Sequence, residues 1–166
     1  MVQEMATAEL EGGQLGPRAQ YLHQAVLQCR HTSLETLIAL GAPLSNRDRS
    51  GETALHAAVR GNCLFSLRRL VQAGADLDAL SFHEWTPLML AARYGYSTLV
   101  HELIQAGAKI DTKGFHGWTA LHLAYQHRAK EAVVLLLQAG ADVDARDNDG
   151  IAACEACLAS AVWGAV

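Results

Sequence analysis

Apolar residues recur along the chain with the spacing of short amphipathic helices. In the segment "LRRLVQ" they are Leu67, Leu70 and Val71, the i, i+3, i+4 pattern that places side chains on one helix face. A shorter apolar segment precedes it, in which Leu55, Ala57 and Ala58 would face the same neighbours. The pattern therefore predicts pairs of short helices, the first of each pair about nine residues long with a face of small residues.

The helix pairs repeat with a period of 33 residues. The similar segments "TALHAAVRG", "TPLMLAARYG" and "TALHLAYQHR" each begin 33 residues after the last, at Thr53, Thr86 and Thr119. The segments "QAGADLD", "QAGAKID" and "QAGADVD" repeat in the same register. A helix pair of this size cannot close its own core and must stack on its neighbours. We therefore expect an all-α solenoid of helix-turn-helix units.

Residues that start and stop helices support this division. The three threonines stand where the first helices should begin, because a threonine hydroxyl can cap the free N–H groups there. Pro87 fits the first helical position, where its missing N–H is not needed. The second helices should end at Gly74, Gly107 and Gly140. The break between the two helices favours a left-handed residue, and the residues at that position are Asn62, Gly95 and Arg128.

These motifs resemble the ankyrin repeat family. The resemblance is carried by "TPLMLAARYG", "TALHLAYQH" and "GADVDARDNDG", and it covers residues 16 to 160. It implies a β-turn finger, two antiparallel helices and a loop in each unit, with a concave surface formed by the fingers and the first helices. The expected repeats span 16–47, 48–80, 81–113 and 114–146, followed by a partial repeat at 147–160.

The ends of the chain depart from the repeat pattern. The first repeat lacks the Gly-Thr start, as expected of a capping repeat, and a flexible tail is expected at 1–15. The partial repeat supplies only a first helix, followed by a short apolar tail at 161–166. Either the sequence is a fragment or a natural short form, or Trp163 folds over the end of the stack.

The resemblance places an aromatic patch on two neighbouring fingers. Both fingers carry a Phe-His-x-Trp pattern, as Phe82, His83 and Trp85 and then as Phe115, His116 and Trp118. Exposed fingers are usually polar, and large apolar patches are rare on monomers, so we expect these tryptophans to be exposed and to bind a partner. The alternative is that the rings pack on one another and only stiffen the fingers.

Charged and polar residues accompany this patch. First-helix positions that should point away from the stack hold Arg60, Arg93, Tyr94 and His127, and the preceding finger contributes Arg49 and Glu52. The arginines would make the N-terminal side of this surface selective for charge. Asp147 and Asp149 would place the opposite charge at its C-terminal side. An extended ligand could thereby be oriented along the surface.

The histidines fall into two groups. His23, His56 and His122 share one repeat position, and we expect each to bridge its threonine and a neighbouring loop backbone rather than to bind a metal. His83, His116 and His127 lie on the expected concave face, but their spacing matches no zinc signature.

Two further motifs have structural interpretations. The C-x-x-C at Cys154 to Cys157 is isolated and in register with buried positions, where cysteine acts as a small apolar residue. Asp78, Asp111 and Asp144 recur after the helix pairs, and we expect them to hydrogen-bond the local loop backbone.

Composition narrows the class of protein. The 166 residues are 51% hydrophobic and 18% charged, which indicates a globular chain. A formal net charge of −4 argues against nucleic acid as the partner. We find no signal peptide and no membrane-spanning run, and the four cysteines form no disulfide framework. A cytoplasmic or nuclear location is therefore expected.

These observations predict a protein–protein interaction module that acts as an adaptor, scaffold or inhibitor. The alternative is a substrate-recognition subunit of a larger complex such as a ubiquitin ligase, although no sequence after the last repeat would hold a recruiting box. An enzyme or metal protein is a third class, but no P-loop, metalloprotease or nucleophile motif is present. No cofactor is expected, and the partner and the oligomeric state stay open.

Overall fold

The computed structural model describes residues 17–153 of the chain. The described residues divide into two compact units, 17–76 and 77–153. Within the described residues there are helices and one isolated antiparallel bridge, between Arg146 and Ala152, and no strand. The expected all-α class is confirmed. The expected tails at 1–15 and 161–166, the C-x-x-C motif and Trp163 lie outside the described residues.

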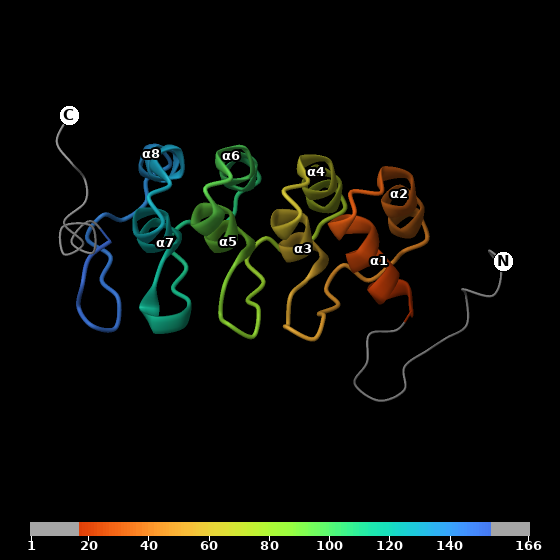
Figure 1. The fold of residues 1–166 in the computed structure, drawn as a ribbon, viewed down its shortest axis with the longest axis horizontal. Coiled ribbons are helices and arrows are strands. Elements are labelled where there is room, and N and C mark those ends of the chain that lie inside the picture. Colours follow the sequence, from red (N-terminus) through yellow and green to blue (C-terminus); the bar gives the residue numbers. More distant parts are fainter. Residues whose placement is uncertain (1–16, 154–166) are drawn as a thin grey trace. The chain divides into compact units, whose positions relative to one another are not determined.

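Unit 1 holds two helix pairs. Its helices are α1 (Pro17–Leu27), α2 (His31–Ala39), α3 (Ala54–Arg60) and α4 (Leu64–Gln72). The first helices α1 and α3 pack side by side, and the second helices α2 and α4 do the same (Figure 1). The first pair is helical from Pro17 onward although it lacks the Gly-Thr start.

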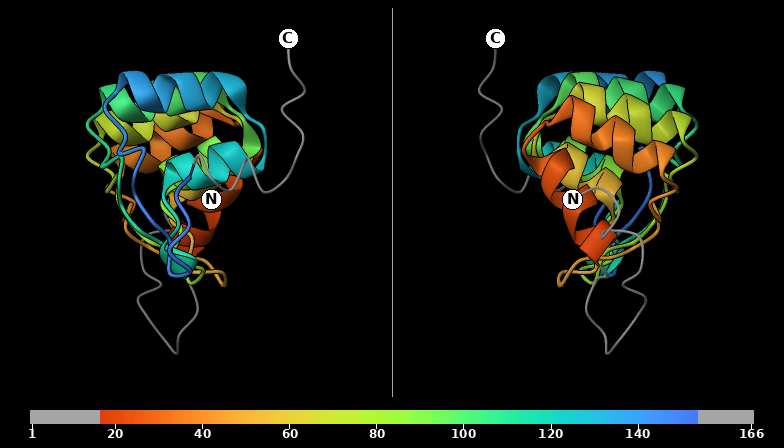
Figure 2. Two further views of the ribbon diagram at one scale, coloured as in Figure 1. Left: turned by 90° about the vertical axis from the view of Figure 1, so that its left-hand side faces the viewer. Right: turned by 90° about the vertical axis from the view of Figure 1, so that its right-hand side faces the viewer.

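Unit 2 repeats this arrangement. It contains α5 (Pro87–Tyr94), α6 (Ser97–Gln105), the short 3-10 turn η2 (Phe115–Gly117), α7 (Ala120–Gln126) and α8 (Lys130–Gln138). Helix α5 packs on α7, and α6 packs on α8. Figure 2 shows the loops of this unit projecting on the side opposite α6 and α8. The fingers of unit 2 therefore lie on the side away from its second helices.

Small residues explain why the first helices pack closely. Every residue of α3 from Ala54 to Val59 is buried, and in α5 the buried run extends from Pro87 to Ala92. The second helices bury only one stripe, which in α4 includes Leu67 and Leu70. Each fully buried leucine contributes about 2 kcal/mol through the hydrophobic effect. The short alanine-rich helix thus forms the inner layer, and the amphipathic helix covers it.

The helix ends follow the predicted chemistry. The side chain of Thr86 accepts a hydrogen bond from the Met89 amide at 3.2 Å. In two other repeats a histidine completes the cap, because Nδ1 of His56 accepts from the Thr53 amide and Nδ1 of His122 accepts from the Thr119 amide, both at 3.2 Å. Pro87 is the first residue of α5, as predicted.

Left-handed residues stand at the predicted positions and at the equivalent positions of the first repeat. After the second helices the glycines have positive φ, at Gly41, Gly74, Gly107 and Gly140. Between the helices the left-handed residues are Cys29, Asn62, Gly95 and Arg128. Arg128, with φ at 57°, adopts a conformation that costs a side-chain-bearing residue about 1 kcal/mol or more.

The expectation that Asp78, Asp111 and Asp144 bond their own loop backbone is wrong for Asp111. The carboxylates of Asp78 and Asp111 do reach backbone amides, but the amides belong to the next repeat. Asp78 Oδ1 accepts from the Lys109 amide at 2.8 Å, and Asp111 Oδ1 accepts from the Asp142 amide at 3.0 Å. These bonds therefore join each of these loops to the loop of the following repeat.

Candidate partner-binding surface

The finger loops are closed in two different ways. In the finger 47–52 the carboxylate of Asp48 accepts from the amides of Ser50 and Glu52 at 2.8 and 2.9 Å, and Arg47 donates to the Gly51 carbonyl. In the finger 146–151 Asp147 and Arg146 make the equivalent bonds. The two central fingers, 80–85 and 113–118, carry neither residue type at these positions.

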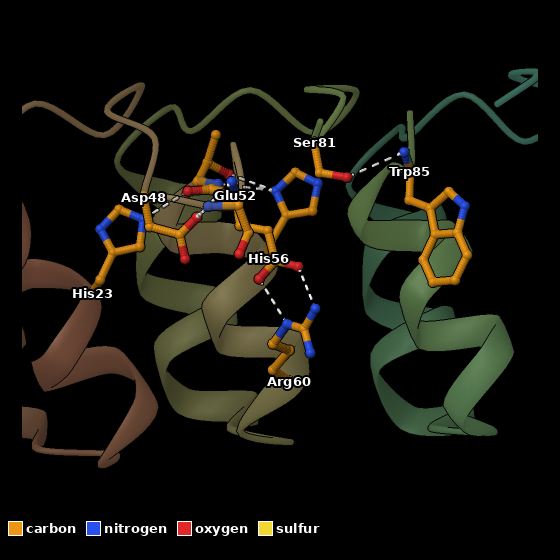
Figure 3. A network of polar contacts seen from close by, with 9 residues as sticks. His23, Asp48, Glu52, His56, Arg60, Ser81 and Trp85 are labelled. Carbon is orange, nitrogen blue, oxygen red and sulfur yellow. Dashed lines mark hydrogen bonds and ion pairs between the residues drawn. The ribbon is translucent and has the colours of Figure 1, made fainter. Parts of the chain in front are cut away.

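In the finger 80–85 a smaller contact replaces the carboxylate. The Ser81 hydroxyl accepts from the Trp85 amide at 3.3 Å (Figure 3). Gly114 has the equivalent position in the next finger, and a Cβ there would collide with the Glu84 carbonyl. Glu84 itself is left-handed, with φ at 56°, at a position where the other three fingers have Gly51, Gly117 and Gly150.

Glu52 does not point away from the stack as expected. It is 4% exposed, and its carboxylate accepts two hydrogen bonds from Arg60, at 2.5 and 2.6 Å (Figure 3). Its carbonyl oxygen also lies 2.9 Å from Nε2 of His23. The expectation failed because it treated the finger as surface, whereas Arg60, eight residues later, neutralises the carboxylate and allows its burial.

Arg93 makes a different contact at the equivalent position of unit 2. Position 85 is a tryptophan where unit 1 has Glu52, and the Arg93 guanidinium lies 4.5 Å from the centre of the Trp85 ring. It lies 5.9 Å from the Tyr94 ring, which in turn stacks on Tyr96 at 5.5 Å. Such cation–π contacts leave the guanidinium N–H groups available to other acceptors.

The phenylalanines of the two central fingers are more exposed than the tryptophans. Phe82 is 70% exposed and Phe115 is 51% exposed, whereas Trp85 and Trp118 are half-buried. The expectation that both tryptophans are exposed therefore needs correction. Trp85 is covered by Arg93, and Trp118 Nε1–H donates to Asp147 Oδ2 at 3.3 Å.

The third finger is held by ring contacts and by its neighbour. The rings of Phe115 and His116 are 4.0 Å apart, and His116 is 5.9 Å from Trp118. The carbonyl of His116, whose φ is 58°, accepts from the Asn148 amide at 2.9 Å. The rings of this finger thus pack on one another, as in the alternative interpretation, while Phe115 keeps half of its surface exposed.

The two groups of histidines have different surroundings. His122 joins its threonine to a neighbouring loop, because Nδ1 accepts from Thr119 and Nε2 lies 3.2 Å from the Ile151 carbonyl. His83, His116 and His127 are exposed, and no group of three metal-ligating side chains occurs within residues 17–153. Partial burial, together with the nearby charge of Arg93, lowers the pKa of His127. This shift favours a neutral imidazole beside the arginine.

The structure therefore divides the predicted binding residues between the two units. Unit 2 brings together two fingers and the first helices beside them, with Phe82, His83, Trp85, Arg93, Tyr94, Phe115, His116, Trp118 and His127. In unit 1, Arg49 is exposed and Arg60 is paired with Glu52. Tyr96 and Glu84 were missed, although the aromatic spacing at 94 and 96 and the absent glycine at 84 were visible signals.

Comparison with protein-family models gives a match to "Ankyrin repeats (3 copies)" over residues 22–114 and 83–147. A comparison with curated proteins finds no matching sequence. No helix among the described residues has the length and apolar character needed to cross a bilayer.

Proposed function

Because the chain belongs to the ankyrin repeat family, whose repeats are generally protein–protein interaction modules, we propose that it binds a partner protein through the two central fingers of unit 2. Phe82 and Phe115 are the apolar contacts, and Arg93 supplies the polar one. Ankyrin repeat proteins are typically non-enzymatic, and we propose that this chain acts by binding alone.

The exposure of two phenylalanines at the same place on neighbouring fingers carries the proposal. At 70% and 51% exposure, Phe82 and Phe115 present apolar faces on the loop side of unit 2. An exposed phenylalanine at a loop tip adds nothing to the stability of the fold, whereas its burial against a partner contributes about 2 kcal/mol to binding. Aromatic side chains and arginine are also the types that dominate the binding energy of interfaces.

Arg93 adds selectivity for the partner. Its ring contacts hold the guanidinium in place, and among residues 17–153 no carboxylate contacts it. A held guanidinium loses less side-chain entropy when it forms a bidentate hydrogen bond. An acceptor group of the partner, beside its apolar residues, would satisfy these N–H groups.

The role we propose is that of an adaptor, scaffold or inhibitor in the cytoplasm or nucleus. A substrate-recognition role within a ubiquitin ligase would use the same surface and would need a second surface for the ligase. A cytoplasmic or nuclear location implies reduced cysteines. The free thiols of Cys29 and Cys63 are compatible with such a location.

Affinity capture with a matched control tests the proposal. The bait proteins would be wild type, the Phe82→Ala/Phe115→Ala variant and the Val134→Ala/Leu137→Ala variant, which removes exposed apolar side chains from α8. A partner of the fingers is retained by wild type and by the α8 variant and is lost from the finger variant. A partner that the finger variant retains at the wild-type level would contradict the proposal.

A further inference from the structure

Two cysteines of unit 1 lie together although they are far apart in the sequence. Cys29 is the left-handed residue between α1 and α2, and Cys63 is the N-cap residue of α4. The Cys29 thiol is hydrogen-bonded to the sulfur of Cys63. The backbones also approach closely here, since a Cβ on Gly61 would lie 3.3 Å from the Leu27 carbonyl oxygen.

The repeat register gives an independent view of this geometry. Adding 66 residues to Cys29 and Cys63 gives Gly95 and Ala129 of unit 2, which occupy the same two turn positions. A Cβ built on Gly95 lies 3.5 Å from the Ala129 Cβ. Disulfides require Cβ atoms about 3.5–4.5 Å apart. Two cysteines at these positions are therefore spaced for a bond between them.

The two turns share their backbone bonds, so the comparison is valid. The Cys63 amide donates to the Ala58 carbonyl at 2.9 Å, and the Ala129 amide donates to the Ala124 carbonyl at the same distance. Cys29 and Gly95 are both left-handed, with φ at 49° and 70°, so their Cβ directions correspond. We propose that Cys29 and Cys63 are a redox-active pair, modified by oxidation to a reversible disulfide between the first two repeats.

The surroundings assign different roles to the two sulfurs. Cys63 is 5% exposed, and its sulfur lies 3.1 Å from the Ser66 hydroxyl at the start of α4. Although burial alone would raise the pKa of Cys63, hydrogen bonds from Cys29, from the Ser66 hydroxyl and from backbone amides lower it. Burial and the bond to Cys63 raise the pKa of Cys29 to about 11. The N-terminus of α4 and the Ser66 hydroxyl both favour a thiolate at Cys63, so Cys63 reacts first and Cys29 resolves it.

The chemistry balances with a peroxide as the oxidant. The Cys63 thiolate attacks one oxygen of hydrogen peroxide, the O–O bond breaks, and the leaving hydroxide takes a proton to become water. The Cys29 thiol then attacks the resulting sulfenic sulfur, and the S–O bond breaks with release of a second water. Two thiols and one peroxide give one disulfide and two waters, and a cellular thiol reductant reverses the change.

The consequence is a covalent link between the turns of two repeats. The loop it closes runs from Cys29 to Cys63 and contains α2, the finger 47–52 and α3. Such a bond restricts the unfolded chain and resists separation of the two helix pairs. Oxidation would therefore stiffen unit 1 without touching the finger residues of unit 2.

Mass spectrometry of the full chain tests the proposal. Cys154 and Cys157 are first replaced by serine, because they could form a disulfide of their own. After treatment with hydrogen peroxide, the protein is expected to lose two hydrogen atoms, and non-reducing peptide mapping should join the Cys29 and Cys63 peptides. The melting temperature should rise by on the order of 5 °C and return after reduction with dithiothreitol.

Single variants separate the roles of the sulfurs. With Cys29→Ser, the same treatment should add oxygen to Cys63 and join no peptides. With Cys63→Ser, Cys29 should react more slowly than Cys63 does. Three results in the protein that keeps Cys29 and Cys63 would overturn the proposal. The two sulfurs could be oxidised separately, they could form cross-links between molecules, or they could remain unmodified thiols after peroxide treatment. Because the readout is mass and not partner binding, failure here leaves the proposed function untouched.

Discussion

The guanidinium of Arg93 lies 4.5 Å from the centre of the Trp85 ring. In unit 1 the same two positions hold Arg60 and Glu52, which form a bidentate ion pair. One residue change at the base of the finger thus converts a paired arginine into one that no carboxylate contacts among residues 17–153. The repeat scaffold is kept, while its surface chemistry differs between the two units.

The paired arginine should be important for stability. In the Arg60→Met variant the buried Glu52 carboxylate loses both of its Arg60 hydrogen bonds, and we expect the free energy of unfolding to fall by about 2 kcal/mol. Adding Glu52→Gln to that variant removes the buried charge and should recover most of the loss. Urea unfolding of the two single variants and the double variant measures this coupling. If the loss of stability in the double variant equals the sum of the losses in the two single variants, the two side chains do not interact.

The strained finger residue predicts a stabilising substitution. Glu84 has φ at 56° where the other fingers have glycine, and a left-handed conformation costs a non-glycine residue about 1–2 kcal/mol. Glu84→Gly should therefore raise the free energy of unfolding by about 1 kcal/mol, since part of the gain is offset by the greater freedom of glycine in the unfolded chain.

The matched control for that substitution is in the fourth finger. Gly150 has φ at 79°, and nothing lies within 4 Å of a Cβ built there, so Gly150→Ala tests conformational strain without collision. It should lower the free energy of unfolding by about 1 kcal/mol. The two changes are compared by urea unfolding, and a destabilised Glu84→Gly protein would show that the Glu84 side chain makes a needed contact.

The repeat frame could be predicted from sequence because it depends on local chemistry. The 33-residue period, the threonines at helix starts and the left-handed glycine positions such as Gly74 each reflect a backbone requirement that one residue satisfies. The Asp78 carboxylate could not be assigned in this way, because its acceptor role depends on an amide 31 residues later. The same limit applies to Glu52, whose burial depends on the side chain that follows on α3.

The sequence predicted the residue types of the binding surface more accurately than it predicted which of their side chains are exposed. The sequence placed Phe82, Trp85, Phe115 and Trp118 on two neighbouring fingers, and unit 2 brings these fingers together. Which rings are open depends on side-chain contacts that a periodic pattern does not contain. Arg93 covers Trp85 and Asp147 holds Trp118, so the phenylalanines become the more exposed pair.

The titration of His127 reports on Arg93. Because burial and then the positive charge of Arg93 lower the pKa of His127, Arg93→Gln should move it part of the way back toward the ordinary value of 6.5. Proton NMR of the imidazole during a pH titration measures the shift. Lys109→Gln, a loss of charge elsewhere in unit 2, is the control and should leave the His127 pKa where it is.

The sign of the accompanying stability change follows from proton binding. A histidine with a lowered folded pKa binds fewer protons when folded than when unfolded. The stability of wild type should therefore decrease as the pH falls from above 6.5 through the folded pKa, and His127→Gln should remove this part of the decrease. Urea unfolding at several pH values would contradict the account if the variant showed the same slope.

Asp147 should control the mobility of Trp118. Its carboxylate accepts from the amides of Asp149 and Ile151 and from the Trp118 indole, so Asp147→Ala frees both the finger and the ring. In a Trp85→Phe/Trp163→Phe background, the fluorescence of Trp118 should become more sensitive to acrylamide. Asp149→Ala, which removes a neighbouring carboxylate, should change the quenching far less.

Acid should have the same effect as the Asp147 substitution. Hydrogen bonds lower the pKa of Asp147 below its ordinary 3.8. The largest effect comes from the Ile151 amide, followed by the Asp149 amide and the Trp118 indole. The stabilisation is thus present above that value and is lost as the pH falls through the lower folded pKa. Quenching of Trp118 that stays constant through this acid range would show that the carboxylate does not hold the ring.

The affinity for a captured partner tests the central claim most directly. The Kd would be measured by isothermal titration for wild type, Phe82→Ala, Phe115→Ala, Arg93→Gln and Val134→Ala. We predict that each of the first three substitutions weakens binding tenfold or more, as expected for contacts at the centre of an interface, and that Val134→Ala leaves the Kd unchanged. Unchanged affinity in the finger and Arg93 variants, with all proteins folded, would contradict the account.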